Sequence, residues 1–124
     1  MKQLLLIGMN PYSLDFSLPG FPSGMTPELV MEGIRSEKEK LAASGYNLET
    51  YLPDLDNPEI ETLQKLLLGK HYDGIIIGAG IRVPPSNFIL FEQLINLVHQ
   101  FAPLSKIIFN TKPSDNVISV QRWL

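Results

Sequence analysis

The residues best suited to binding a ligand follow a short, strongly apolar segment of the chain. Residues 75–77 are three consecutive isoleucines, and Gly78, Gly80 and Arg82 come directly after them. Glycines let the backbone approach a ligand closely and turn its N–H groups toward it. An arginine can form a bidentate pair with phosphate or carboxylate, worth about 1.5–3 kcal/mol. This segment therefore favours a small anionic ligand.

A second group of polar residues follows the apolar segment at residues 4–7. The connection there runs for about sixteen residues, whereas loops between a strand and a helix usually have about 2–6, and long ordered loops are often functional. Asp15 is a weak candidate for a general acid–base catalyst, because a partly buried carboxylate has a raised pKa. The candidate ligand-binding residues of this connection are Asn10, Tyr12, Ser13, Asp15 and Ser17.

Two further residues, Asn110 and Thr111, follow the segment at residues 106–110 and could extend the same site. A structural alternative stays open for Arg82, which could pair with Asp15 or Asp54 and fix a loop. In that case Gly78 and Gly80 would serve only as turns. Whether the protein is an enzyme also stays open, since no residue pattern identifies a reaction.

The elements that must position these residues alternate between strand and helix. Two strands are predicted from unbroken apolar runs, at residues 4–7 and 74–78. A third is predicted from an alternating run at residues 46–52, and a fourth from a short run at residues 106–110. Helices are predicted over residues 27–44 with Thr26 as the N-cap, from Asn57 to Gly69, from Ser86 or Asn87 to Ala102, and from Ser114 to Trp123.

This alternation predicts a single α/β domain over residues 1–124, with a four-stranded parallel sheet. The two apolar strands belong inside and the alternating strand on an edge, so the expected order is 2-1-3-4. That is a three-layer, doubly wound, flavodoxin-like or Rossmann-like fold, shortened by one unit. Its ligand crevice lies where the first and third strands end.

Composition and motifs argue against several functions. The net charge of −3 and the lack of a basic run disfavour nucleic acid and membranes as partners. The sequence has no cysteine, which excludes disulfides, thiolate nucleophiles and cysteine zinc sites. Val83 stands where a dinucleotide fingerprint needs its third glycine, and Pro11 removes a donor from the first loop, so NAD and flavin are disfavoured. No metal site is expected. The first apolar run is shorter than a signal sequence needs, and a cytoplasmic protein is expected.

The helix predicted after Asn87 is apolar over much of its circumference. Phe88, Phe91, Leu94, Ile95 and Val98 form one stripe, and Leu90, Leu97 and Phe101 widen it. Such a helix is either deeply buried or shared with another chain. One alternative function is therefore an interaction protein that forms a homo-oligomer through this helix and has no small-molecule site. Equally, the long first loop could fold over the helix.

The combination of DFSLPGFPSGMT, GAGIRVPP, FNTKPSDN and QRW resembles a family of small bacterial and fungal α/β proteins. The resemblance would cover nearly the whole chain. It implies no activity that could be transferred to this protein.

Overall fold

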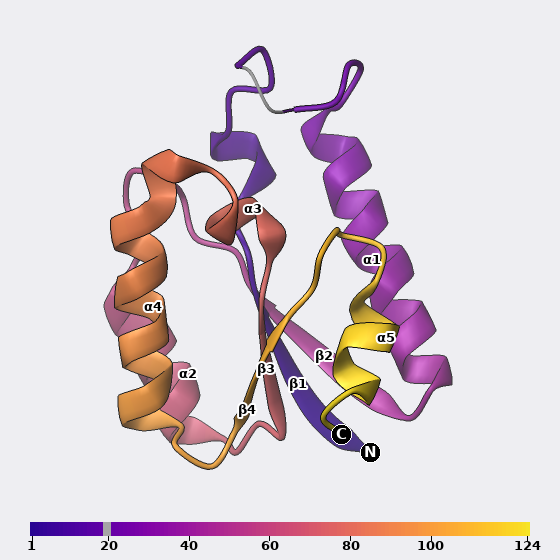
Figure 1. Cartoon of the computed structure of the whole chain (residues 1–124), viewed down its shortest axis with the longest axis vertical. Helices are drawn as coiled ribbons and strands as arrows, with labels where there is room; N and C mark the ends of the chain where they lie inside the picture. Colours follow the sequence, from indigo (N-terminus) through magenta and orange to yellow (C-terminus); the bar gives the residue numbers. More distant parts are fainter. Residues whose placement is uncertain (19–20) are drawn as a thin grey trace.

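The structure is a computed structural model that describes residues 1–18 and 21–124. Its centre is a four-stranded parallel sheet in the order β2-β1-β3-β4, which confirms the predicted fold class and strand order (Figure 1). The strands are β1 (Lys2–Ile7), β2 (Tyr46–Tyr51), β3 (Gly74–Ile77) and β4 (Lys106–Phe109).

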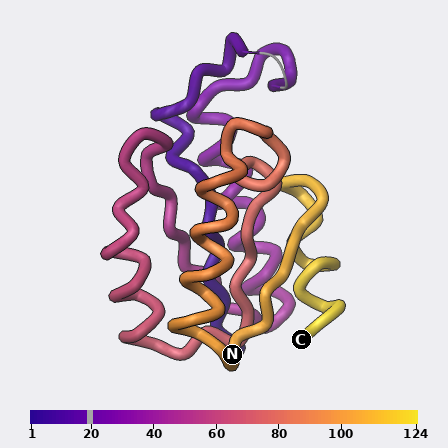
Figure 2. The backbone as a smooth tube through the Cα atoms, turned by 60° about the vertical axis from the view of Figure 1, so that its left-hand side comes forward, coloured from indigo at the N-terminus to yellow at the C-terminus, as the bar shows by residue number. Residues whose placement is uncertain are grey.

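Helices cover both faces of the sheet and complete a three-layer arrangement. Figures 1 and 2 show α1 (Pro27–Ala43) and α5 (Asn116–Gln121) on one face, and α2 (Ile60–Gly69) and α4 (Phe88–Phe101) on the other. Each face has its own apolar core: Leu41 and Val120 pack in one, and Leu63 and Leu94 in the other. The four consecutive residues at the end of β1 are all buried because side chains on both faces meet helices.

Helix α1 begins and ends as its sequence predicts. The Thr26 hydroxyl accepts the Leu29 N–H at 3.2 Å, and Pro27 occupies the first turn, where a missing donor costs nothing. Gly45 follows the helix with φ of +92°, a conformation that favours glycine. These residues fix the direction in which α1 leaves the first loop.

Several element boundaries differ from the predictions. α2 begins at Ile60 rather than after Asn57, because Glu59 adopts a left-handed conformation with φ of 47°. α5 begins at Asn116 rather than Ser114, with Asp115 as its N-cap. Tyr51 belongs to the alternating run at residues 46–52, in which Asn47 and Glu49 share its face, yet Tyr51 is buried because helices cover that face of the sheet.

Three short helical segments lie where the sequence indicated only loops. They are η1 (Pro11–Ser13) after β1, α3 (Ala79–Arg82) after β3, and η2 (Pro85–Asn87) before α4. Asn87 precedes α4 as predicted, but its side chain donates to the carbonyl of Gly80 at 3.1 Å instead of capping the helix. The glycine-rich segment is therefore a compact turn of helix tied to the start of α4.

Among the described residues, no helix has both the length and the apolar character that crossing a membrane would require.

Candidate functional site

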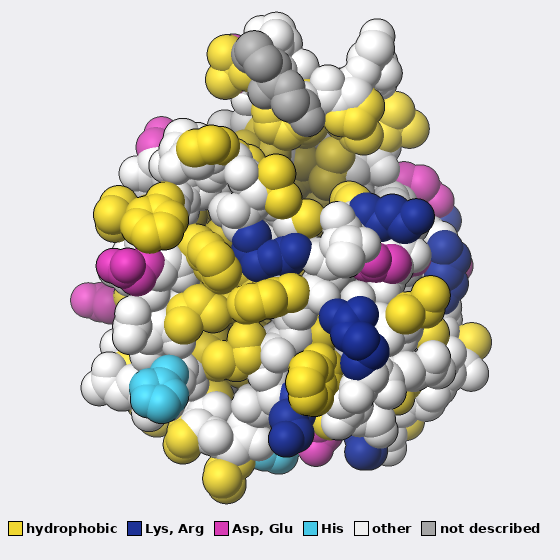
Figure 3. Space-filling view, viewed as in Figure 1, with side chains coloured by type: hydrophobic (Ala, Val, Ile, Leu, Met, Phe, Trp, Pro, Cys, Tyr) yellow, Lys and Arg dark blue, Asp and Glu magenta, His cyan; other side chains and the backbone are white. Residues whose placement is uncertain are grey.

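A pocket of about 920 Å³ opens at the carboxyl ends of β1 and β3. Its walls come from the loop after β1, the first half of α1, and the segment from α3 to η2. Figure 3 shows the corresponding recess on the upper part of the molecule, with hydrophobic side chains around it. The pocket thus lies where the topology reverses direction, which is the place at which open α/β sheets bind ligands.

The structure brings only some of the predicted site residues to this pocket. Its lining includes Asp15, Gly78, Gly80, Asn110 and Thr111. The described lining does not include Asn10, Tyr12, Ser13, Ser17 or Arg82.

Asn10 and Ser13 hold the first loop against the loop that follows β2. The Asn10 Nδ2 donates to Asp54 Oδ1 at 2.8 Å, and its backbone N–H donates to the Pro53 carbonyl at 2.8 Å. Ser13 Oγ accepts the Leu55 N–H at 3.3 Å. Tyr12 is exposed. These contacts give Asn10 and Ser13 a positioning role behind the pocket wall.

Arg82 joins the ends of β3 and β4 and is not among the described residues that line the pocket. Its Nη1 donates to the Ile77 carbonyl at 2.5 Å and to Asn110 Oδ1 at 3.3 Å, and its Nη2 donates to the Asn110 carbonyl. The guanidinium lies 4.9 Å from the Phe109 ring centroid, and burial lowers the pKa of Arg82. Within the described part of the chain it pairs with neither Asp15 nor Asp54, so that structural alternative was wrong about the partners.

Asp15 lies at the rim of the pocket and is exposed. Its Oδ1 accepts the Ser17 hydroxyl at 2.6 Å and the Ser17 N–H at 3.0 Å, and these bonds lower the pKa of Asp15. The expected raised pKa was therefore wrong, because the carboxylate is stabilised by donors and is not buried. Asp15 is ionised at neutral pH.

A row of buried polar side chains forms the floor of the pocket, and sequence reasoning missed most of it. Asn110 Nδ2 donates to Asn116 Oδ1 at 2.9 Å, and Asn116 Nδ2 donates to Glu37 Oε1 at 3.2 Å. Glu37 is only 4% exposed, and its Oε2 lies 3.0 Å from the Nζ of Lys40. Asn110 Oδ1 also accepts the Ala79 N–H at 2.9 Å. The row links α1, α5, β4 and α3 at one end of the sheet.

Glu37 could have been found from its position in α1. It lies three residues after Ile34 and four before Leu41, so it shares their inward face. Four charged residues in succession, EKEK, obscured this because such runs usually lie on exposed faces. A carboxylate in an apolar stripe is the signal that was available.

The pocket walls are apolar and aromatic. Phe16 and Phe21 from the first loop pack edge to face with their ring centroids 4.8 Å apart, and both line the pocket. Val83 and Pro84 line it from the other side. Within residues 1–18 and 21–124 there is no group of three or more His, Cys, Asp or Glu side chains placed to hold a metal ion. The pocket therefore combines apolar walls with a polar floor.

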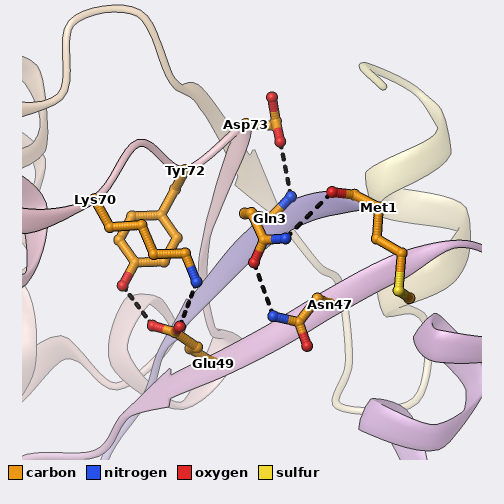
Figure 4. Close-up of polar contacts among 7 residues, drawn as sticks. All are labelled: Met1, Gln3, Asn47, Glu49, Lys70, Tyr72 and Asp73. Carbon is orange, nitrogen blue, oxygen red and sulfur yellow. Dashed lines mark hydrogen bonds and ion pairs between the residues drawn. The ribbon is translucent and has the colours of Figure 1, made fainter.

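The opposite, amino end of the sheet is occupied by polar contacts between strands and the segment before β3 (Figure 4). Glu49 accepts hydrogen bonds from Lys70 and from the Tyr72 hydroxyl, the latter at 2.6 Å. The bond from Lys70 lowers the pKa of Glu49, and burial raises the pKa of Tyr72. These residues satisfy one another and stabilise the edge of the sheet.

Comparison of the chain with models of protein families, with curated proteins and with solved structures finds no match. The resemblance to a family of small bacterial and fungal proteins therefore stays a prediction.

Proposed function

We propose that this protein binds a small, largely apolar organic molecule in the pocket at the ends of β1 and β3. The supporting observation is the combination of an apolar cavity of about 920 Å³ with one buried polar floor. Ligand pockets usually measure about 300–1,000 Å³ and carry a few placed polar groups in mostly apolar walls. The ligand's apolar body would lie beside Phe16 and Phe21, and its polar end would reach Asn116 and Glu37.

The prediction of an anionic ligand depends on Arg82, and its contacts give that prediction little support. Three hydrogen bonds from its guanidinium go to Ile77 and Asn110. These bonds use three of the five N–H donors of the guanidinium, so only two donors are left for an anion, and Arg82 is not among the described residues that line the pocket. We propose ligand binding without a catalytic step. The one candidate for an acid–base catalyst, Asp15, is exposed and ionised.

A blocking substitution tests the proposal without disturbing the polar floor. Gly33 lies in α1 and lines the pocket, and a Cβ atom placed there would have no neighbouring atom within 4 Å, so a side chain can begin there without a clash. We expect Gly33→Phe to fill the cavity, keep the fold and abolish thermal stabilisation by small molecules that stabilise the unsubstituted protein. Ala43→Phe, at an exposed position of the same helix, is the matched control. Equal stabilisation of both variants would contradict the proposal.

A second function, self-association through α4, is favoured by the exposure of its first turn. Phe88 is 61% and Ile89 71% exposed, whereas Leu94 and Val98 are buried in the core beside α2. If α4 joins two copies of the chain, sedimentation should detect a dimer that Phe88→Glu dissociates. Gln93→Glu, which adds the same charge at an exposed position of α4, is the control. A monomer at all concentrations would exclude this function.

A further inference from the structure

We infer that the ligand of this pocket carries a positively charged amine on an apolar body, with the amine paired to Glu37. The inference rests on the proposed function and specifies the chemical class of its ligand. It reverses the sign of charge that the sequence favours.

The charged groups that line the pocket are mostly acidic. They are Asp15, Glu37 and Lys112, and Arg82 is not among the described lining residues. Asp15 and Lys112 are both exposed, so water screens their opposite charges, whereas Glu37 is almost fully buried. A buried charge acts more strongly on its neighbours than an exposed charge does. Glu37 is thus the buried charge of the described lining, and because its partner Lys40 is 57% exposed, that ion pair offsets the Glu37 charge only in part and leaves a preference for a cation.

The polar floor also has acceptor positions left for a donor. Glu37 Oε1 accepts two N–H groups of Asn116, at 3.3 and 3.2 Å, while Oε2 is paired only with Lys40 among the described residues. Each carboxylate oxygen can accept about two hydrogen bonds. The Lys40 side chain is 57% exposed, so this partner is largely in water. An ammonium group in the pocket would give Oε2 a second, shielded partner.

The walls are suited to the rest of such a molecule. Phe16 and Phe21 present aromatic surface at the mouth, and Leu14 and Val83 add aliphatic surface. Aromatic faces attract cations as well as apolar groups. An aryl-alkyl amine would place its ring against these side chains and its nitrogen at the floor.

Three probes of the same size and different charge test this inference. They are 4-phenylbutylamine, 4-phenylbutan-1-ol and 4-phenylbutanoate, titrated into the full chain by calorimetry. We expect the amine to bind at least tenfold more tightly than the carboxylate, with the alcohol between them. The Glu37→Gln variant should no longer bind the amine more tightly than the carboxylate. Glu39→Gln, an exposed position that changes the net charge equally, should keep it.

The Lys40→Gln variant provides a test that leaves Glu37 in place. Removing the Lys40 ammonium takes away the competing partner, so the amine should bind more tightly, by roughly threefold or more. A folded Lys40→Gln variant is decisive if Glu37→Gln fails to fold, as judged by circular dichroism.

The outcomes separate the inference from the proposed function. Equal affinity for all three probes, or tighter binding of the carboxylate, would contradict the inference of an amine ligand. The proposed small-molecule site would be unaffected by that result. An amine preference that survives Glu37→Gln, or that weakens in Lys40→Gln, would remove Glu37 from the inference. No binding of any probe, with no difference between Gly33→Phe and the unsubstituted protein, would count against the pocket itself.

Discussion

The substitution Asn110→Ala tests whether the buried polar row holds the carboxyl end of the sheet together. Asn110 is 3% exposed and takes part in three side-chain hydrogen bonds, with Ala79, Arg82 and Asn116. Alanine would leave the Ala79 N–H and the Asn116 Oδ1 without these partners. Both groups lie at the floor of the pocket.

The expected cost follows from these bonds. A hydrogen bond contributes about 0.5–1.5 kcal/mol net, and an unsatisfied buried partner costs about 1–3 kcal/mol. The Arg82 bond is long, at 3.3 Å, and its guanidinium is partly exposed, so it contributes least. We expect a total loss of about 2–4 kcal/mol in the free energy of unfolding, a large part of the ~5–15 kcal/mol typical of a domain.

Urea denaturation followed by circular dichroism measures this loss. The midpoint should fall while the slope of free energy against urea stays the same, since the surface exposed on unfolding is unchanged. Amide hydrogen exchange should show lost protection at Ala79, whose N–H donates to Asn110. Asn96→Ala removes one exposed hydrogen bond within α4 and should change stability by less than about 0.5 kcal/mol. A loss below about 1 kcal/mol for Asn110→Ala would refute the structural role of the row.

Three further substitutions probe single contacts. Arg82→Met should lower the free energy of unfolding by about 1–3 kcal/mol, because three carbonyl bonds to Ile77 and Asn110 are lost; no change in urea denaturation would contradict this. Burial raises the pKa of Tyr51 from 10.0 to about 12. The neutral Tyr51 hydroxyl therefore makes its full contribution to the free energy of unfolding below pH 10, and this contribution is lost between pH 10 and 12. The unfolding free energy should fall there by on the order of 2 kcal/mol, and Tyr51→Phe should flatten this fall. Gly45→Ala, at φ of +92°, should cost about 1 kcal/mol in thermal denaturation, and an unchanged melting temperature would argue against the left-handed turn.

The fold could be predicted from the sequence because its signals are local and strong. Unbroken apolar runs at residues 4–7 and 75–77 favour burial on both faces, and Thr26 followed by Pro27 is typical of the start of a helix. Two features that were missed depend on tertiary contacts. Tyr51 is buried because a helix covers its face of the sheet, and Asn87 bonds to Gly80 across a turn.

The position of the pocket could be predicted, but its chemistry could not. Strand order alone places a crevice at the ends of β1 and β3. The direction of the Arg82 side chain depends on the carbonyls of Ile77 and Asn110, which the sequence does not reveal. Glu37 lies in a run of four charged residues, which is typical of an exposed helix face, so its burial at the pocket depends on how α1 packs. For these reasons the predicted arginine lies outside the lining and an unpredicted carboxylate lies within it.

The most direct test of the central claim is a fragment screen by ¹H–¹⁵N nuclear magnetic resonance, with glycine amides as reporters. Gly33, Gly78 and Gly80 line the pocket, whereas Gly45 and Gly69 end helices at the far end of the sheet. We predict that aromatic and aliphatic fragments shift the first three amides and leave the other two unchanged, and that Gly33→Phe removes the response. Shifts confined to Gly45 and Gly69, or no shift with any fragment, would contradict the claim that this pocket binds small molecules.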